Sequence, residues 1–344
     1  MEELKTRIEK TLSVLKSVNK LELSEVELRG VKEDEVLIEV HYSSINAEDY
    51  FFCRDDVHTE DTLFPCGTTG SGIIQQVGQS LSKSQYLHQI VAFYLPKQGT
   101  WTQYLILPIK YICVINEPVL SMREACLVYA FPLAAMAFIF QIQNKGHMGF
   151  VQSNPTSILG KTLIKVCKKK GITVINIAQN EKEVKDLYKI GAKYVLNAES
   201  PEFLAQLKQI SGKLEIEIFF DCIGGDLSSS ILDVMPNKSI LYCYAGLRNQ
   251  SLQNINPKTL ILSQKAIKGW NLSNSFIFNE EAILDDILQF ILNDIRSEGE
   301  LFSCKTEQIL ELTSVPDYLN KSKTKKHDSD PEDIVLIKIC AQDS

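Results

Sequence analysis

The middle of the chain alternates short apolar strands with helices, and this alternation constrains the fold more than any other feature of the sequence. Residues 150–152 form a short apolar segment, a polar loop follows, and residues 159–170 then have helical spacing up to Gly171. The unit recurs, with strands expected at 173–177, 194–196, 216–221 and 239–244 and helices at 181–190, 203–210 and 227–234. Strands that alternate with helices form a parallel sheet with helices on both faces. The pattern predicts a doubly wound α/β domain.

The segments on either side of this region have a different pattern. Short strand-like runs separated by Gly, Pro and Asp clusters precede it, at residues 35–40, 72–78, 90–95 and 101–107. After it, residues 280–293 and 306–320 have the spacing of amphipathic helices, and residues 334–339 suggest a closing strand. We therefore predict a discontinuous, β-rich first domain of residues 1–125 and 279–344, with an α/β domain of residues 126–278 inserted in it.

Composition narrows the classes of function. The 344 residues carry a formal net charge of -7, and the pI near 5.4 disfavours a nucleic-acid-binding protein. The nine cysteines form no C-x-x-C pair, as expected of reduced thiols in an intracellular compartment, cytoplasmic or mitochondrial. The N-terminus lacks the apolar core of a signal peptide. The longest apolar run, residues 127–140, is too short to span a bilayer, and Pro132 favours a buried helix beginning there.

The loop between residues 152 and 161 is the candidate nucleotide-binding segment. A strand, a tight loop and a helix N-terminus can hold a pyrophosphate, because free backbone N–H groups and the helix dipole favour an anion there. Gly160 is the only glycine at this helix entry, where it would permit close packing of the helix on the sheet. Thr156 and Ser157 could donate hydroxyls, and Lys161 could add a positive charge. The segment predicts a dinucleotide site with a reduced glycine fingerprint.

The end of the next strand governs the choice of ribose. A carboxylate at that point binds the 2′-hydroxyl of NAD. Here the strand ends in Ala178-Gln179-Asn180, with no acidic residue before Glu181 and no arginine to hold a 2′-phosphate. Lys182 is near in sequence, and we expect it to be an ordinary surface charge.

Neither a metal site nor a serine-nucleophile site is indicated. The five histidines have no ligand spacing with any cysteine, so no zinc is expected. No G-x-S-x-G elbow is present either.

A series of short motifs follows one known pattern along nearly the whole chain. In the first domain, the family's I-N-P-x-D, P-G-x-E-G-x-G and G-T-[YW]-A-E-Y motifs correspond to residues 43–49, 65–72 and 99–104. In the second, its N-P-x-T-A, A-S-A-L-G-R, F-D-x-x-G-G, Y-G-A and G-[FW]-x-L motifs correspond to residues 131–135, 156–161, 220–225, 244–246 and 269–272. The chain thus resembles the medium-chain dehydrogenase/reductase superfamily, in its zinc-free branch of quinone reductases and mitochondrial-type enoyl thioester reductases.

The resemblance implies a GroES-like first domain, a Rossmann second domain and a cleft between them. It also implies NADPH as cofactor without zinc, hydride transfer to an activated alkene or a quinone, and a homodimer. Asn46 would then line the nicotinamide face, and Tyr50 is the nearest phenol that could donate a proton. The residues expected to hold the cofactor are Thr156, Ser157, Leu159, Gly160, Lys161, Gln179, Asn180, Gly224 and Gly246.

Several positions depart from the family pattern. Thr69 replaces the acid of P-G-x-E-G-x-G, and Phe131 and Ala134 replace the Asn and Thr of N-P-x-T-A. Related reductases often carry arginine or lysine near the end of the second strand, where Glu183 would repel a 2′-phosphate. Each lost contact to a charged phosphate costs on the order of 1.5–3 kcal/mol.

Two functions of different classes remain open. One is an NAD(P)H-dependent, zinc-independent oxidoreductase of quinones or enoyl thioesters with a relaxed cofactor site, and the retained Asn46, Gly160, Gly224 and Gly246 favour it. The other is a catalytically silent reductase-fold accessory subunit of a larger assembly, for example a mitochondrial respiratory one. The loss of polar groups that face the cofactor favours this second function. Either a homodimer or a subunit of a larger protein complex is expected, with no membrane-spanning segment.

Overall fold

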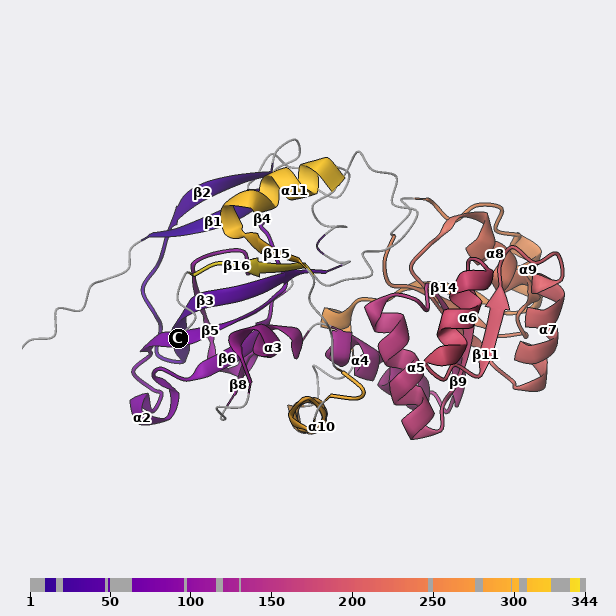
Figure 1. The fold of residues 1–344 in the computed structure, drawn as a ribbon, viewed down its shortest axis with the longest axis horizontal. Coiled ribbons are helices and arrows are strands. Elements are labelled where there is room, and N and C mark those ends of the chain that lie inside the picture. The colour runs from indigo at the N-terminus through magenta and orange to yellow at the C-terminus, as the bar shows by residue number, and fades with distance from the viewer. Residues whose placement is uncertain are drawn as a thin grey trace, which may run out of the picture. The chain divides into compact units, whose positions relative to one another are not determined.

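The chain divides into two compact units in its computed structural model (Figure 1). The described residues are 10–16, 21–46, 49, 64–95, 98–115, 120–129, 131–246, 250–275, 281–297, 299–302, 308–322 and 335–340. The first unit consists of Met1–Ala130, Lys305–Lys325 and Ile334–Ser344, and the second of Phe131–Cys304 and Lys326–Asp333. The predicted boundary at residues 278/279 differs from this division. Helix α10 (Glu281–Arg296) packs against α4 (Phe131–Gln143) and therefore groups with the second unit.

The first unit is built mainly from antiparallel strands. Its larger sheet has seven strands in the order β15-β16-β3-β5-β6-β8, with β7 also paired to β3. A second sheet has the order β2-β1-β4. The strands are β1 (Lys10–Lys16), β2 (Leu21–Glu27), β3 (Glu35–Ile45), β4 (Phe64–Pro65), β5 (Thr69–Val77), β6 (Ile90–Tyr94), β7 (Tyr104–Pro108), β8 (Ile112–Val114), β15 (Gln308–Glu311) and β16 (Val335–Lys338). The helices are α2 (Lys83–Tyr86), η1 (Ile109–Tyr111), α3 (Met122–Leu127), η4 (Leu312–Ser314) and α11 (Val315–Ser322).

Alternation along β3 creates the core of the larger sheet. Val36, Ile38 and Val40 are fully buried and pack with Ile74 and Phe93 of the neighbouring strands. Because successive side chains of a strand point to opposite faces, every second residue from Val36 to Val40 enters this core.

The expected helix at residues 306–320 is wrong in its first half. Residues 308–311 form β15, which pairs in parallel with β16 in the register Gln308↔Val335 to Glu311↔Lys338. The helix begins only at Val315, and its buried residues Val315 and Leu319 join Leu312 in a separate core cluster. Backbone pairing with a strand that lies later in the chain overrides the helical spacing here.

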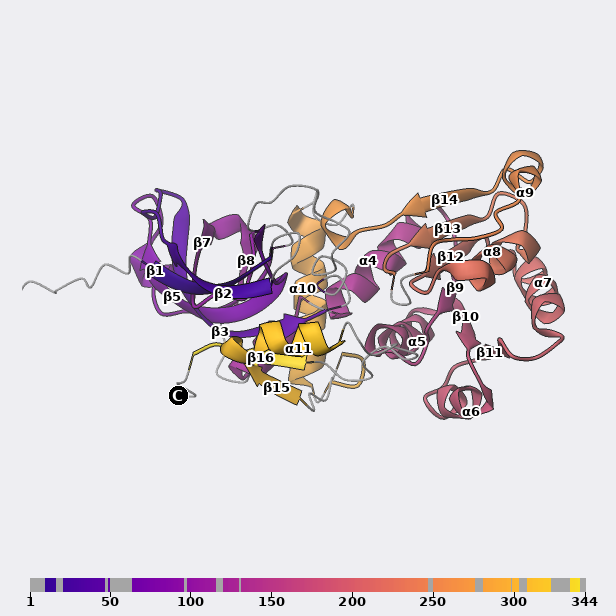
Figure 2. The same ribbon diagram turned by 90° about the horizontal axis from the view of Figure 1, so that it is seen from above.

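The second unit has six parallel strands in the order β11-β10-β9-β12-β13-β14, and Figure 2 shows them side by side in this order. They are β9 (Gly149–Ser153), β10 (Thr173–Ala178), β11 (Tyr194–Asn197), β12 (Ile218–Asp221), β13 (Ile240–Cys243) and β14 (Ala266–Gly269). Counted along the chain, this is the strand order 3-2-1-4-5-6 of a dinucleotide-binding sheet. The predicted fold class, a GroES-like β-rich domain with a Rossmann domain, is confirmed.

Helices cover both faces of the parallel sheet. On one face, Phe203 and Leu207 of α7 and Ile231 of α8 pack against Ile175 and Ile177 of β10. On the other, Ile164 of α5 and Leu187 of α6 pack with Ala178. The helices of this unit are α4, α5 (Ile158–Lys170), α6 (Glu181–Lys189), α7 (Phe203–Lys213), α8 (Gly225–Val234), α9 (Pro257–Leu262), η2 (Leu272–Asn274) and α10.

The apolar segment around Pro132 behaves as expected. Helix α4 starts at Phe131, so Pro132 occupies its first turn, and Phe138 and Ile142 are fully buried. By length and composition alone, Met122–Gln143 could cross a membrane, but 76% of its apolar window is buried inside the structure. This burial favours a core segment.

Candidate nucleotide-binding site

The loop after β9 turns into α5 through a short hydrogen-bonded bend. Asn154 adopts a left-handed backbone conformation with φ of 55°, which asparagine tolerates better than most residues. Its carbonyl oxygen accepts hydrogen bonds from the backbone N–H and the hydroxyl of Ser157, at 3.3 and 3.0 Å. The Ser157 hydroxyl in turn accepts the N–H of Gly160 at 3.1 Å, so Ser157 is the N-cap of α5. Thr156 lies in the bend, and Leu159 and Lys161 lie half-buried in the first turn of α5.

Gly160 is required by the closeness of helix and loop. A Cβ atom at this position would lie 2.6 Å from the Cα of Pro155 and 2.7 Å from the carbonyl oxygen of Asn154. Both are backbone atoms, which cannot rotate away. This closeness is the role that the third glycine of a dinucleotide fingerprint plays, and it brings the N-terminus of α5 to the carboxyl end of β9.

Two buried side-chain amides inside the sheet hold this loop in place. The side chain of Gln152 donates to the Gly160 carbonyl at 3.3 Å and to Asn176 Oδ1 at 2.7 Å. Asn176 donates in turn to the carbonyl of Tyr194 at 2.9 Å. The network ties β9, β10 and β11 together next to α5. Neither amide is among the site residues predicted from the sequence, although a polar residue inside an otherwise apolar strand is a signal that could have found them.

The end of β10 is met by the carboxylate of Glu183, the residue expected near the ribose from the family pattern. Asn180 is the N-cap of α6 and accepts the N–H of Glu183 at 3.0 Å. Glu183 reaches back so that its Oε2 accepts the N–H of Gln179 at 2.8 Å. The carboxyl group therefore lies beside the last residues of β10, although Glu183 belongs to the helix.

The loops after β12 and β13 complete this edge of the sheet. Asp221 is buried and accepts the N–H groups of Ile223 and Gly224 at 3.2 and 3.0 Å. Gly224 has a φ of 78°, and a Cβ there would lie 2.4 Å from the Gln250 carbonyl oxygen. Gly246 follows β13 (Ile240–Cys243). The expected cofactor residues of the second unit thus meet at the carboxyl ends of β9, β10, β12 and β13, where ligands bind in open α/β sheets.

An aromatic cluster lies close to the same edge. The Phe138 ring of α4 stacks on Phe220 with ring centroids 4.1 Å apart. It also makes edge-to-face contacts with Tyr244 and Trp270, whose ring centroids lie 5.0 and 4.2 Å from its own. Phe131 and Ala134, which replace polar residues of the family pattern, lie in the first turn of α4 and are half-buried.

Asn46 lies in the first unit, inside a network of polar side chains. Its Nδ2 donates to the hydroxyls of Thr68 and Thr69, each at 3.1 Å, and its Oδ1 accepts the hydroxyl of Ser44 at 3.1 Å. Its backbone N–H donates to Asp49 at 2.7 Å. These bonds hold Asn46 in one orientation, and Thr69, the replacement for the family's acid, is one of the partners. Tyr50 lies outside the described residues.

Within the described parts of the chain, the side chains do not form a metal centre. No group of three or more His, Cys, Asp or Glu side chains has a metal-binding arrangement among those residues. Burial raises the pKa of the Cys126 thiol, and that of Cys167 to about 12, so neither is ready to act as a thiolate ligand or nucleophile at neutral pH.

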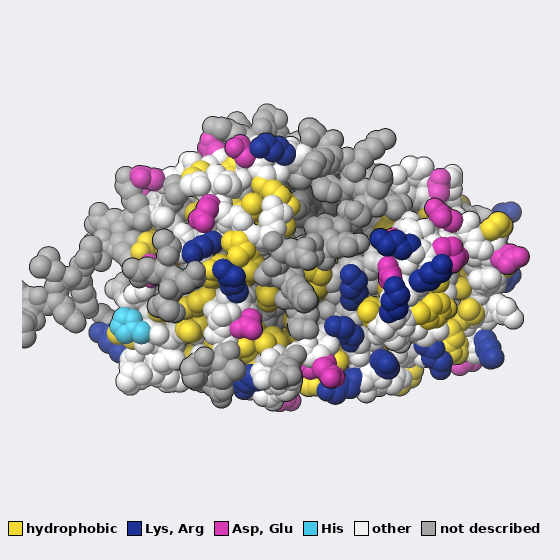
Figure 3. Space-filling model, viewed as in Figure 1, with side chains coloured by type: hydrophobic (Ala, Val, Ile, Leu, Met, Phe, Trp, Pro, Cys, Tyr) yellow, Lys and Arg dark blue, Asp and Glu magenta, His cyan; other side chains and the backbone are white. Residues whose placement is uncertain are grey.

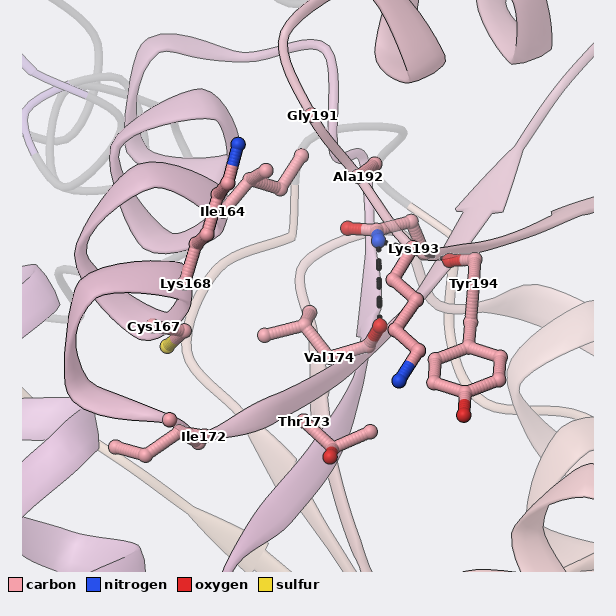
Figure 4. A pocket seen from close by; sticks show the side chains of 12 residues that line it. Ile164, Cys167, Lys168, Ile172, Thr173, Val174, Gly191, Ala192, Lys193 and Tyr194 are labelled. Atoms are coloured by element: carbon pink, nitrogen blue, oxygen red, sulfur yellow. Dashed lines mark hydrogen bonds between the residues drawn. The ribbon is translucent and has the colours of Figure 1, made fainter.

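A pocket of the second unit lies at the opposite edge of the sheet. It has a volume of about 260 Å³ and is lined by Thr173 and Val174 at the start of β10, with Lys168 from α5 and Lys193 from the turn before β11 (Figure 4). Because it opens at the amino ends of the strands, it is separate from the edge described above.

This chain is similar to known dehydrogenases and reductases. A family model described as "Zinc-binding dehydrogenase" matches residues 159–289. A mitochondrial enoyl-[acyl-carrier-protein] reductase of Arabidopsis thaliana is 23% identical over 79% of this chain and 73% of its own length. The predicted resemblance to the medium-chain dehydrogenase/reductase superfamily is confirmed.

Two solved structures share the fold over nearly their whole length. A putative NADPH:quinone reductase from Mesorhizobium loti superposes with a TM-score of 0.79 at 23% identity, covering 97% of this chain and 99% of the other. A complex of Etr1p from Candida tropicalis with NADP and crotonyl-CoA has a TM-score of 0.73 at 18% identity, covering 96% and 99%. Identities this low establish the shared fold alone.

Proposed function

We propose that the chain binds a nicotinamide dinucleotide on its second unit and acts as an NAD(P)H-dependent oxidoreductase of the quinone or enoyl thioester reductase type, without zinc. The observation that carries this proposal is the packing at Gly160, which has no room for a Cβ and brings a capped helix N-terminus to the end of the first strand. Helix N-termini in this position hold pyrophosphate groups.

The residues present fit such a cofactor at its phosphate end. Thr156, Ser157, Leu159, Gly160 and Lys161 would surround the pyrophosphate, with Lys161 supplying a positive charge from the first turn of α5. The other residues proposed to contact the dinucleotide are Gln179, Asn180, Gly224 and Gly246. When bound, the reduced nicotinamide would supply a hydride to an activated alkene or a quinone.

The first unit would contribute the groups that orient the reacting atoms. Asn46 is held by hydrogen bonds to Ser44, Thr68 and Thr69, and we propose that it lines the nicotinamide face in this fixed orientation. Tyr50 is proposed as a proton donor on its position in the sequence, four residues after Asn46.

A second function, a catalytically silent accessory subunit of a larger assembly, is favoured by one observation. The amide of Asn46 is hydrogen-bonded to Ser44, Thr68 and Thr69 of the first unit, and Phe131 and Ala134 replace polar residues of the family pattern at the start of α4. Such a subunit would keep the fold and lose hydride transfer. A mitochondrial location suits either function, since several similar proteins are mitochondrial reductases. A homodimer is expected for the enzyme, and one similar structure is a heterodimer.

Cofactor binding separates the two functions. The purified protein is titrated with NADH and with NADPH up to millimolar concentration while nicotinamide fluorescence is followed, and turnover is then assayed with a quinone and with a crotonyl thioester. Saturable binding with turnover supports the enzyme. Absence of binding at millimolar cofactor overturns it, and elution of the native protein from cell extract with a large complex would then support the accessory subunit.

A further inference from the structure

The Glu183 carboxylate is held at the point where a dinucleotide-binding sheet meets the adenosine ribose. Its Oε2 accepts the N–H of Gln179, directly after β10, at 2.8 Å. Its own N–H is capped by Asn180 Oδ1 at 3.0 Å, and the Asn180 amide lies 3.5 Å from Oε1. This arrangement is a variant of the capping box, in which the third helical residue reaches back to the chain before the helix. The carboxylate is therefore fixed by the backbone around it.

We propose that Glu183 is the specificity-determining acid of this site and that the chain takes NADH in preference to NADPH. The inference rests on the proposed cofactor binding and adds the choice of cofactor to it. In dinucleotide-binding sheets an acidic side chain near the end of the second strand accepts hydrogen bonds from the 2′-hydroxyl of the ribose. Here the strand itself ends without an acid, and the helix returns one to the same place.

The remaining hydrogen-bonding capacity of Glu183 suits a hydroxyl. An ionised carboxylate offers about four acceptor positions and no donor. The contacts to Gln179 and Asn180 use two of them, and the side chain is half-buried, so acceptor positions remain on its open side. A ribose hydroxyl can donate to them, whereas a 2′-phosphate brings a second negative charge to the same spot. Charges a few ångströms apart at a protein surface repel strongly enough to weaken binding roughly 10- to 100-fold.

Nearby lysines would favour a 2′-phosphate, because their positive charges attract it. Lysine side chains gather over α5 and α6 on the face shown in Figure 3. The pKa of the Asp186 carboxyl is lowered by its hydrogen bond from Lys189 first, and more weakly by the charges of Lys182 and Lys161. Part of this positive charge is thus matched by an acid on α6. No arginine occurs between residues 150 and 246, so the planar fork that binds a phosphate through two parallel hydrogen bonds is absent there.

Binding of ADP-ribose and of its 2′-phosphate to the full chain tests this, measured by isothermal titration calorimetry. Wild-type protein is expected to bind ADP-ribose at least about tenfold more tightly than the 2′-phosphate. Glu183→Gln removes the charge and keeps an acceptor for the Gln179 N–H, so the helix cap survives. It should bring the two affinities to within about threefold of each other, mainly by tightening binding of the 2′-phosphate. The matched control is Glu181→Gln, which removes the same charge two residues away, where the carboxylate accepts from Asn197 at 3.0 Å. Its affinity ratio should stay near that of the wild type.

The outcomes separate the two levels of the proposal. Equal or tighter binding of the 2′-phosphate by the wild type overturns the NADH preference and leaves dinucleotide binding standing. A ratio that shifts equally in Glu183→Gln and Glu181→Gln also overturns it, since the effect would then be general surface charge. If neither ligand binds the wild type at millimolar concentration, the proposed function fails and this inference fails with it.

Discussion

The buried amide of Gln152 donates to the Oδ1 of Asn176 at 2.7 Å, joining the first two strands of the parallel sheet through their side chains. Both residues are 1% exposed. Because Gln152 also donates to the carbonyl of Gly160, the start of α5 is anchored to the strand from which the loop departs. The position of the candidate pyrophosphate loop therefore depends on polar groups inside the sheet as well as on the loop itself.

Replacing Asn176 should destabilise the second unit. Asn176→Ala removes the acceptor of the buried Gln152 amide and the donor to the Tyr194 carbonyl. Losing these hydrogen bonds should lower the free energy of unfolding by about 1–3 kcal/mol. Urea unfolding followed by far-UV circular dichroism measures the change in free energy of unfolding. The exposed Asn237→Ala serves as the control and should stay within about 0.5 kcal/mol of wild type. Equal stability of the two variants would show that the network contributes nothing.

Two helical glycines, Gly160 and Gly212, should respond to alanine in opposite directions. In Gly160→Ala the new methyl group would lie 2.6 Å from Pro155, so the loop must move, at a cost of about 1–3 kcal/mol, and dinucleotide binding should weaken with it. In Gly212→Ala, on α7, nothing lies within 4 Å of the new Cβ, and a gain of about 0.4–1 kcal/mol is expected. Thermal unfolding compares the two, and a stabilising Gly160→Ala would contradict the close packing described above.

Glu35 should make the first unit more stable at neutral than at acidic pH. The pKa of its carboxyl is lowered chiefly by the hydrogen bonds from the Arg29 guanidinium, one of them 2.7 Å long. A lowered folded-state pKa means that the stabilisation is present above the ordinary value of 4.5 and is lost as pH falls through the folded-state pKa. Arg29 is 50% exposed, so the pair is worth at most about 1 kcal/mol.

The measurement uses the distribution of the two tryptophans, Trp101 in the first unit and Trp270 in the second. In a Trp270→Phe background, the fluorescence of the buried Trp101 reports unfolding of the first unit. Glu35→Gln should lower stability at pH 7 and flatten its decline below about pH 5. The exposed Glu33→Gln is the control. A decline in Glu35→Gln as steep as in the parent protein would refute the assignment.

Cys167 should resist alkylation in the folded protein. Burial raises the pKa of its thiol to about 12, partly offset by the charge of Lys170, so at pH 8 almost none of it is thiolate. Iodoacetamide labelling read by peptide mass spectrometry should be roughly a thousandfold slower than for an ordinary thiol. The same peptide should label readily in concentrated urea. Rapid labelling of the native protein would mean that α5 opens or that the thiol is accessible.

Much of the second unit was predictable because its signals are local. The helix over residues 159–170 was expected to end at Gly171, and Gly171 does close it in a left-handed conformation with φ of 70°. The alternation of strands and helices likewise predicted the doubly wound parallel sheet, which is confirmed. In the first unit, by contrast, β1 and β2 and the strand at residues 308–311 were missed. The pairing partner of residues 308–311 is β16, which lies later in the chain, and residues 308–311 are mostly exposed, with no apolar alternation to mark them. β1 and β2 are neighbours in the chain and pair with each other, so distance in sequence does not explain why they were missed.

In the candidate site, too, the locally encoded features were predictable and those set by distant partners were not. By itself the sequence determined that a helix N-terminus with a single glycine follows the first strand, since caps, glycine and helical period act within a few residues. Only the tertiary structure decided that Gln152 and Asn176 support this loop and that Glu183 returns to the end of β10. The reason is physical: the partners of these side chains are set by strand register and by the path of the backbone. A residue's place in the sequence therefore did not show which groups its carboxylate or amide would bond to.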